Sequence, residues 1–229
     1  MFAPRSSGRV TTPWSSRLAN DNIHTDPVVS SDRDELILVD PSDQELGYLS
    51  KERCHDGDGV LHRAFSLFVL DRAGRVLMQQ RAGDKRLWPG YWSNACCSHP
   101  RRGEDTAEAV RRRAAEELGI HIDAPEYLYK FEYHARFDAS GSEHELCHVY
   151  VARIEQDPRP NRNEIDAWAW YDPQDLDAML AQEDETLTPW FRLEWQRLRR
   201  EYADRLSPVA QTPTPHSSAR SDRGGPQTD

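Results

Sequence analysis

The segment from Asp105 to Gly119 constrains the fold more than any other part of this chain. Its apolar residues recur at spacings of three and four, at Ala107, Val110, Ala114 and Leu118. This spacing predicts an amphipathic helix, and Gly119 predicts its end, because glycine readily adopts the left-handed conformation that terminates helices. One face of the helix is apolar and has to be buried, so we expect it to pack against a sheet.

Segments rich in apolar, aromatic and β-branched residues lie on both sides of this helix. The predicted strands span 35–40, 64–70, 75–81, 127–136, 145–154 and 165–172. Two further helices are predicted over 173–180 and 189–206. This order predicts an α+β fold, an α/β/α sandwich in which a mixed β-sheet is joined by a central helix and closed by C-terminal helices.

The two ends of the chain differ in composition from its middle. Residues 1–32 and 207–229 are rich in Ser, Thr, Asp and Pro and have little apolar periodicity. We therefore expect a flexible leader over 1–32, one domain over 33–206 and a disordered tail over 207–229. A length of 229 residues is compatible with one such domain carrying polar extensions.

The charge balance excludes some classes of partner. Lys and Arg number 29 against 39 Asp and Glu, which gives a net charge of -10. Such a chain has no overall attraction for nucleic acid or an anionic membrane, so positive charge for an anionic ligand has to be local. No apolar run approaches the roughly 20 residues of a membrane span, and the N-terminus lacks the apolar stretch of a signal peptide. We expect a soluble cytoplasmic protein, and a monomer is compatible with the sequence.

Reactive side chains are densest in the motif NACCSHP, residues 94–100. Cys96 and Cys97 are adjacent and cannot form a comfortable structural disulfide with each other, which favours reduced thiols. The motif is expected to be a loop between the sheet and the central helix, where functional residues concentrate. The alternative is that both cysteines are small buried hydrophobic residues and that His99 is an ordinary loop histidine.

A second group of candidates consists of carboxylates and histidines. Glu143 and Glu145 share one face of a predicted strand, because alternate residues of a strand point the same way. Together with His55, His62 and His99 they would make a mixed nitrogen and oxygen site suited to Mn, Zn or Mg. The alternatives are a solvated pair of carboxylates at a strand edge and three ordinary histidines, and spacing alone does not bring the five together.

The central helix carries a third pattern. It fits the Nudix box, a phosphate and metal motif written G-x5-E-x7-R-E-U-x-E-E-x-G-U, at Ser98, Glu104, Arg112, Glu116, Glu117, Gly119 and Ile120. Ser98 replaces the first glycine, and Arg113 replaces a glutamate that helps to hold the catalytic metals of Nudix pyrophosphatases. Glu117 remains available to bind one hard cation. The alternative is a solvated acidic helix end that a glycine terminates.

From about Lys51 to Trp195 the chain resembles type I isopentenyl-diphosphate delta-isomerase, a member of the Nudix fold superfamily. The resemblance rests on HDGDGVLHRAF, RAGDKRLWPGYWSNACCSHP, the degenerate box, YHARFDASGSEHELC and TPWFRLEW, in this order. The metal ligands implied by the resemblance are His55, His62, His99, Glu143 and Glu145. It also implies that Glu117 binds a Mg²⁺ ion that accompanies the diphosphate.

The resemblance also implies roles for residues around the reacting carbons and the diphosphate. Cys97 and Glu145 match the catalytic cysteine and glutamate of the family, and Cys96 is expected to be a packing residue. Tyr133 and Trp195 match further active-site positions, whereas Trp88, Trp168, Trp170 and Trp190 are expected in the core. The matching basic positions are Lys51, Arg81, Lys85 and Arg113.

The implied reaction is a 1,3-allylic rearrangement, the conversion of isopentenyl diphosphate to dimethylallyl diphosphate in isoprenoid biosynthesis. It protonates one carbon and deprotonates another, and it needs no nicotinamide or flavin. The expected partner is a small prenyl diphosphate. Two other functions compete with it: a Nudix hydrolase that cleaves diphosphates, which Arg113 disfavours, and a non-catalytic binding module stabilised by a metal.

Overall fold

A computed structural model of the chain describes residues 26–209. Most of the predicted leader and nearly all of the predicted tail therefore lie outside the described residues. Within them, one mixed sheet has the strands β1 (Glu35–Val39), β2 (Glu45–Ser50), β3 (His62–Leu70), β4 (Val76–Arg81), β5 (Trp92–Asn94), β6 (Cys96–Ser98), β7 (Glu126–Asp138), β8 (Gly141–Arg153) and β9 (Ile165–Tyr171). The helices are α1 (Lys51–Cys54), α2 (Thr106–Leu118), α3 (Pro173–Ala181), α4 (Pro189–Glu201) and the 3-10 helix η1 (Ala203–Leu206).

Helix α2 confirms the helix predicted from the apolar spacing. It begins where the Asp105 side chain accepts hydrogen bonds from the backbone N–H groups of Ala107 and Glu108, at 2.9 and 3.2 Å. It ends at Gly119, which has a left-handed φ of 61°. A side chain at this position would also meet the backbone oxygen of Arg159, so both conformation and space favour glycine.

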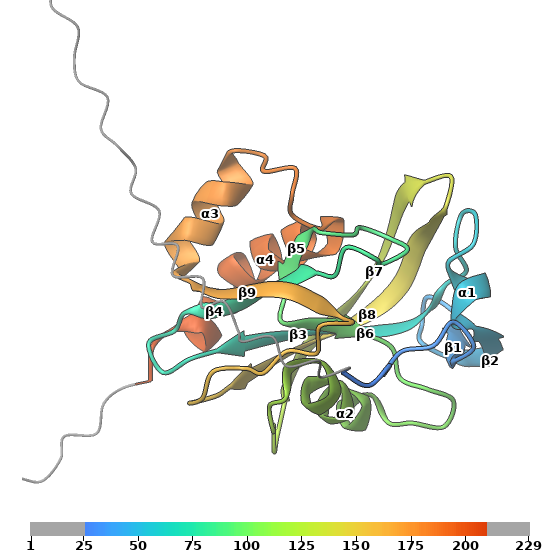
Figure 1. Cartoon of the computed structure of the whole chain (residues 1–229), viewed down its shortest axis with the longest axis horizontal. Coiled ribbons are helices and arrows are strands. Elements are labelled where there is room, and N and C mark those ends of the chain that lie inside the picture. Colours follow the sequence, from blue (N-terminus) through green and yellow to red (C-terminus); the bar gives the residue numbers. More distant parts are fainter. Residues whose placement is uncertain (1–25, 210–229) are drawn as a thin grey trace, which may run out of the picture.

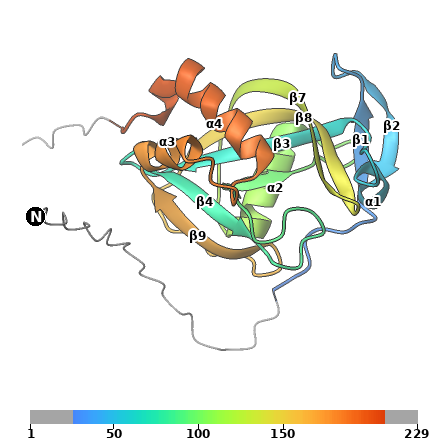
Figure 2. The same ribbon diagram turned by 90° about the horizontal axis from the view of Figure 1, so that it is seen from above.

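The helices cover both faces of the sheet, which confirms the predicted α/β/α sandwich. Helices α3 and α4 lie on one side and α2 lies on the other (Figures 1 and 2). On the α2 side, Ala109, Val110 and Leu118 are fully buried against strand residues. On the α4 side, Trp190, Phe191 and Trp195 pack against residues of β3 and β8.

Strand β3 is the centre of the arrangement that positions the functional residues. It pairs parallel with β8 and antiparallel with β6. The register places Ser66 opposite Cys97 on β6, and it places His62 opposite Glu145 on β8. Residues from three distant parts of the sequence therefore meet around one strand.

Three short strands differ from the sequence expectation. Strand β2 was not predicted, and the expected loop of NACCSHP contains β6 and the end of β5. The C-terminal helix predicted over 189–206 ends at Glu201 and is followed by the separate 3-10 turn η1. Among the described residues, no helix combines the length and the apolar character needed to cross a membrane.

Candidate active site

A cavity of about 350 Å³ is lined by residues of α1, of the strands β4, β6, β7 and β8, of the C-terminal half of α2 and of the N-terminal end of α4. The candidate residues that line it are Lys51, His55, Arg81, Lys85, Cys97, His99, Arg113, Glu117, Tyr133, Glu143 and Glu145. Of the remaining candidates, His62 is buried behind the cavity wall and Trp195 lies elsewhere in the core. The structure thus brings most of the residues predicted from the sequence to one place.

Five of the lining and adjoining residues form a compact cluster, here called the His/Glu cluster: His55, His62, His99, Glu143 and Glu145. Each offers one ligand atom, and all five atoms lie within 4.8 Å of one another. His55 Nε2 is 2.7 Å from a carboxylate oxygen of Glu143. His99 Nε2 is 2.9 Å and His62 Nε2 is 3.8 Å from one oxygen of Glu145.

The backbone fixes two of these imidazoles in the form that binds metals. His55 Nδ1 lies 2.6 Å from the Lys51 carbonyl oxygen, and His62 Nδ1 lies 2.7 Å from that of Val60. A carbonyl oxygen only accepts, so each Nδ1 carries a proton, and each Nε2 faces the cluster, where it could present a lone pair to a metal ion. His62 Nε2 is buried and has no hydrogen-bond partner among the described residues. A cation would satisfy this atom, so the donor set fits a metal ion.

Burial also sets the charges in the His/Glu cluster. Burial, reinforced by neighbouring His55, lowers the pKa of His62 to about 3, so its ring is neutral. Burial opposes ionisation of Glu143, but His55 outweighs it and lowers the pKa of this carboxyl to about 2. Burial and the nearby Glu143 carboxylate raise the pKa of Glu145 well above its usual range. Two carboxylates so close together call for a positive charge between them.

Cys97 lies on the α4 side of β6 and faces the cavity. Its sulfur is 2.9 Å from Asn94 Oδ1, which can accept the thiol hydrogen, and 3.1 Å from the indole Nε1 of Trp190, which donates. The Ser66 hydroxyl lies 3.5 Å away. Burial, with a contribution from Glu194, raises the pKa of the Cys97 thiol to about 12. Cys97 therefore holds a proton at neutral pH.

Cys96 has the opposite orientation, because adjacent residues of a strand point to opposite faces. It is fully buried among the apolar residues of the α2 side, and its thiol donates to Glu117 Oε1 at 3.3 Å. Cys96 does not line the cavity. The expected separation between Cys97 and Cys96 agrees with this geometry.

Trp195, the tryptophan expected at the active site, does not lie there. Trp195 is 1% exposed, stacks on Phe68 and Phe191, and donates its indole N–H to Asp177 at 2.9 Å. It belongs to the core and does not line the cavity. Trp190, expected in the core, is the tryptophan of α4 that lines the cavity and contacts Cys97. Tyr133 lines the cavity as expected and donates to Glu145 Oε2 at 2.7 Å.

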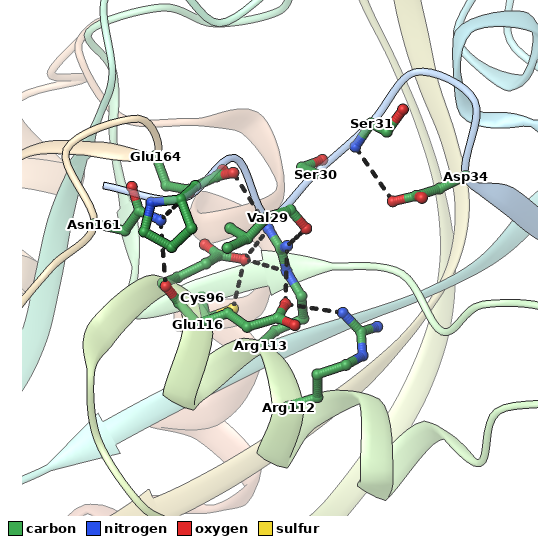
Figure 3. A network of polar contacts seen from close by, with 12 residues as sticks. Val29, Ser30, Ser31, Asp34, Cys96, Arg112, Arg113, Glu116, Asn161 and Glu164 are labelled. Carbon is green, nitrogen blue, oxygen red and sulfur yellow. Dashed lines mark hydrogen bonds and ion pairs between the residues drawn. The ribbon is translucent and has the colours of Figure 1, made fainter. Parts of the chain in front are cut away.

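Arg113 is held at the other end of the cavity by carboxylates and a backbone oxygen. Its guanidinium pairs with Glu117 at 2.6 Å and donates to the Val29 carbonyl oxygen at 2.6 Å (Figure 3). Glu164, which the sequence interpretation missed, lies 3.6 Å from Arg113 and pairs with Lys85. Its place in an irregular segment before β9 gives no pattern from which to find it.

Lys51 and Arg81 complete the basic end of the cavity. Lys51 donates to the Ser30 hydroxyl at 2.6 Å, and burial together with nearby Lys85 lowers its pKa. Arg81 donates to the carbonyl oxygens of Trp88 and Leu87, at 3.1 and 2.9 Å. Together with Lys85, Arg86 and Arg113, these residues give the cavity five basic side chains in a chain whose net charge is negative. Such a local concentration suits a polyanionic ligand.

Comparisons with known proteins agree with the fold. A family model described as NUDIX domain matches residues 60–191. The structure of DR0079 from Deinococcus radiodurans is similar at 24% identity and a TM-score of 0.58, and the match covers 71% of this chain and 98% of that one. The MutT protein from Methanosarcina mazei Go1 is similar at 19% identity and a TM-score of 0.53, with 62% and 95% covered. These two likenesses concern the fold alone.

Curated relatives with higher identity are named for one activity. Isopentenyl-diphosphate Delta-isomerase 1 of Photorhabdus laumondii is 42% identical over 174 residues, which cover 76% of this chain and 99% of the relative. Isopentenyl-diphosphate Delta-isomerase of Burkholderia multivorans is 44% identical over 158 residues, which cover 69% and 89%. The chain therefore belongs to the isopentenyl-diphosphate Delta-isomerase family and carries a NUDIX domain.

Proposed function

We propose that this protein converts isopentenyl diphosphate to dimethylallyl diphosphate by moving one proton onto a carbon and another off a second carbon. One observation carries the proposal: a thiol, Cys97, and a carboxyl group, Glu145, line the same cavity, beside the His/Glu cluster and five basic side chains. An alkene is a very weak base, so it requires a positioned acid and a second group to accept the proton that leaves. The family membership supports the same reaction.

Cys97 and Glu145 suit these two duties because neither is in ordinary solvent. Burial raises the pKa of both groups, so the donor holds a proton at neutral pH, and a cation in the His/Glu cluster would favour the ionised form that Glu145 needs in order to accept a proton. The Tyr133 hydroxyl donates a hydrogen bond to Glu145 Oε2, and the other carboxyl oxygen of Glu145, Oε1, faces the histidines of the His/Glu cluster. In the reverse reaction the two groups exchange the roles of donor and acceptor, as reversibility requires.

Trp190 is the aromatic group that we assign to the cationic intermediate. Its indole N–H contacts the Cys97 sulfur, so the ring lies beside the reacting carbons. A cation over an aromatic face gains about 0.5 to 2 kcal/mol, whereas a polar wall or water would capture it. Trp88 supports Trp190 in an edge-to-face contact with ring centroids 5.2 Å apart.

We assign the His/Glu cluster to one divalent cation, Mn²⁺, Zn²⁺ or Mg²⁺. The ligands would be three neutral imidazole nitrogens and the two carboxylates. Such an ion, when bound, would favour the ionised form of Glu145 and so set its protonation state. The carbonyl oxygens of Lys51 and Val60 orient the rings of His55 and His62 toward this ion.

The basic end of the cavity is the proposed diphosphate site. Arg113, Lys51, Lys85 and Arg81 would bind phosphate oxygens, and Glu117 would bind a Mg²⁺ ion that accompanies the diphosphate. Glu164 pairs with Lys85 and lies near Arg113, which keeps both cations at the cavity wall. Arg113 occupies the position of a metal-binding glutamate in Nudix pyrophosphatases, and a cation there disfavours the hydrolytic metal cluster.

Incubation of the purified protein with isopentenyl diphosphate and Mg²⁺ plus Mn²⁺ or Zn²⁺ tests the proposal. We expect dimethylallyl diphosphate, detected by its new methyl signals in proton NMR, without release of phosphate. Phosphate or pyrophosphate release in place of the rearranged product would indicate a hydrolase. Unchanged substrate across all three metals would indicate a binding module, and either result contradicts the proposal.

A further inference from the structure

Arg81 is held in the cavity by backbone oxygens, whereas Arg113 is held by carboxylates. Within residues 26–209 the Arg81 guanidinium forms no ion pair, and its acceptors are the carbonyl oxygens of Leu87, at 2.9 Å, and Trp88, at 3.1 Å. Arg113, in contrast, pairs with Glu117 at 2.6 Å. Neutral carbonyl groups orient a guanidinium without cancelling its charge, and they occupy two of its five N–H groups. Arg81 therefore keeps its charge and further N–H groups for an anion.

The backbone of Trp88 decides whether both carbonyl groups can reach Arg81. The two groups lie on either side of the Trp88 Cα atom, so the dihedral angles of Trp88 set their relative direction. In an extended segment, successive carbonyl groups point opposite ways. Trp88 instead has a φ of 48°, in the left-handed region that bulky residues avoid, and the following Pro89 disfavours the right-handed alternative. An unfavourable backbone conformation thus directs two consecutive carbonyl groups at one side chain.

The Trp88 ring is the part of this turn that packs into the core. The residue is 3% exposed, and its ring lies edge-on to Trp190 and tilted against Phe137, with centroids 5.2 Å apart in both pairs. The Arg81 guanidinium carbon lies 5.4 Å from the centroid of the same Trp190 ring. Burial of the indole offsets the cost of the left-handed backbone. The ring therefore holds the turn in the form that Arg81 requires.

Building on the proposed diphosphate site, we propose that Trp88 is a positioning residue that fixes Arg81 for the diphosphate. Its backbone directs two carbonyl oxygens at the guanidinium, and its buried ring keeps the backbone in that conformation. Trp88 does not line the cavity, so it acts on the ligand through Arg81. Without the two acceptors the long Arg81 side chain would sample more rotamers, and ordering it on binding would weaken the affinity.

The test measures the affinity of the full chain for inorganic pyrophosphate in the presence of Mg²⁺, by isothermal titration calorimetry. Arg81→Met should raise Kd about tenfold, because a charge-assisted hydrogen bond is lost. Trp88→Ala should raise Kd about fivefold, because alanine has no ring to offset the left-handed backbone. The double variant Trp88→Ala/Arg81→Met should match Arg81→Met within about twofold, since Trp88 acts through Arg81.

Trp88→Gly separates this role from simple packing. Glycine adopts a left-handed φ without steric cost, so Trp88→Gly should bind pyrophosphate more tightly than Trp88→Ala and within about twofold of the wild type. If the ring mattered only as a packing group, glycine would bind no better than alanine, because it fills even less space and makes the chain more flexible.

Trp195→Ala is the matched control for loss of a buried indole. Trp195 is 1% exposed, belongs to the same apolar cluster and does not line the cavity. This variant should lose melting temperature and keep the wild-type Kd for pyrophosphate below the transition. If Trp88→Ala does not fold, Trp88→Leu against Trp195→Leu gives the same comparison, since leucine also avoids a left-handed φ.

Pyrophosphate binding requires no turnover, so this test is independent of the isomerase assay. Absence of dimethylallyl diphosphate, with the order of affinities intact, would contradict the isomerase proposal and leave this inference standing. Wild-type affinity in Trp88→Ala or Arg81→Met would overturn the inference, even in an active isomerase. So would weaker binding by Trp88→Gly than by Trp88→Ala, an additive loss in the double variant, or an equal loss in Trp195→Ala.

Discussion

The two faces of β6 give adjacent, chemically identical residues different surroundings. Cys96 faces the α2 side, where alanine, valine and leucine side chains surround it. Cys97 faces the α4 side, where Ser66, Asn94 and Trp190 supply polar atoms beside a cavity. Burial raises the pKa of both thiols. Thiol acidity therefore does not distinguish the two cysteines, whereas access to the cavity and the polar neighbours do.

The largest effect should separate the two cysteines. Cys97→Ala removes a group that transfers a proton to or from carbon, and we expect kcat to fall by about 1,000-fold or more. Cys96→Ala removes a buried sulfur from the α2 side, and we expect activity within a few-fold of the wild type. Initial rates of dimethylallyl diphosphate formation give the comparison. Similar rates for the two variants would refute the assignment of Cys97.

A second effect should separate two tryptophans within the α4 side. Trp190→Leu removes both the donor to Cys97 and the aromatic face at the cavity, so we expect kcat to fall roughly 10- to 100-fold. Trp195→Phe keeps an aromatic ring in the core, so we expect a lower melting temperature and an almost unchanged kcat. Kinetics and thermal melts of both variants check this, and the opposite pattern would restore Trp195 to the active site.

On the α2 side, the expected effect is on binding of the diphosphate. Arg113→Met should raise KM roughly tenfold and change kcat less, because a charge-assisted hydrogen bond to the substrate is lost in both ground and transition states. Arg112→Met is the matched control, since Arg112 pairs with Glu104 and Glu116 and does not line the cavity. An equal KM for Arg113→Met and the wild type would argue against a phosphate clamp on this face.

The smallest effect concerns the pH dependence of stability and tests Glu194, the buried acid on the α4 side. The pKa of Glu194 rises from its ordinary 4.5 to about 8 on folding, so between these values the folded state binds more protons than the unfolded state. Its contribution to stability is then complete below pH 4.5 and is lost as pH rises toward 8. We expect the melting temperature of the wild type, relative to Glu194→Gln, to fall by a few degrees from pH 5 to pH 8.

Thermal melts of the two proteins in one buffer series measure this difference. Titration of all other groups is common to both proteins and cancels in the subtraction. A constant difference across the range would mean that Glu194 is already ionised in the folded protein.

The sequence predicts those parts of the fold that depend on local periodicity. The helix from Thr106 to Leu118 shows in its apolar spacing, and its N-cap Asp105 and terminal Gly119 are local signals. Strands β5 and β6 have three residues each, too few for an alternation to be recognised. Their existence depends on pairing with β3 and β4, which no local pattern records.

The same distinction explains what could be predicted of the site. The five residues of the His/Glu cluster were predicted from the order of motifs that the chain shares with a known family, not from their spacing. The structure brings their ligand atoms within 4.8 Å of one another. Trp190 and Trp195 are five residues apart on one helix, about 140° around its axis, so the docking of α4 decides which one meets the cavity. Glu194 gives no local signal either, since a charged residue between two tryptophans suggests an exposed face.

The pairing of Cys97 with Glu145 across one cavity is tested most directly by the reaction in D₂O. Isopentenyl diphosphate is incubated with Mg²⁺ and Mn²⁺ and with the wild type, Cys97→Ala or Glu145→Gln, and the product is followed by proton and deuterium NMR. We predict that the wild type yields dimethylallyl diphosphate with solvent deuterium in a methyl group, and that neither variant does so at a measurable rate. Deuterated product from either variant at the wild-type rate would contradict the pairing.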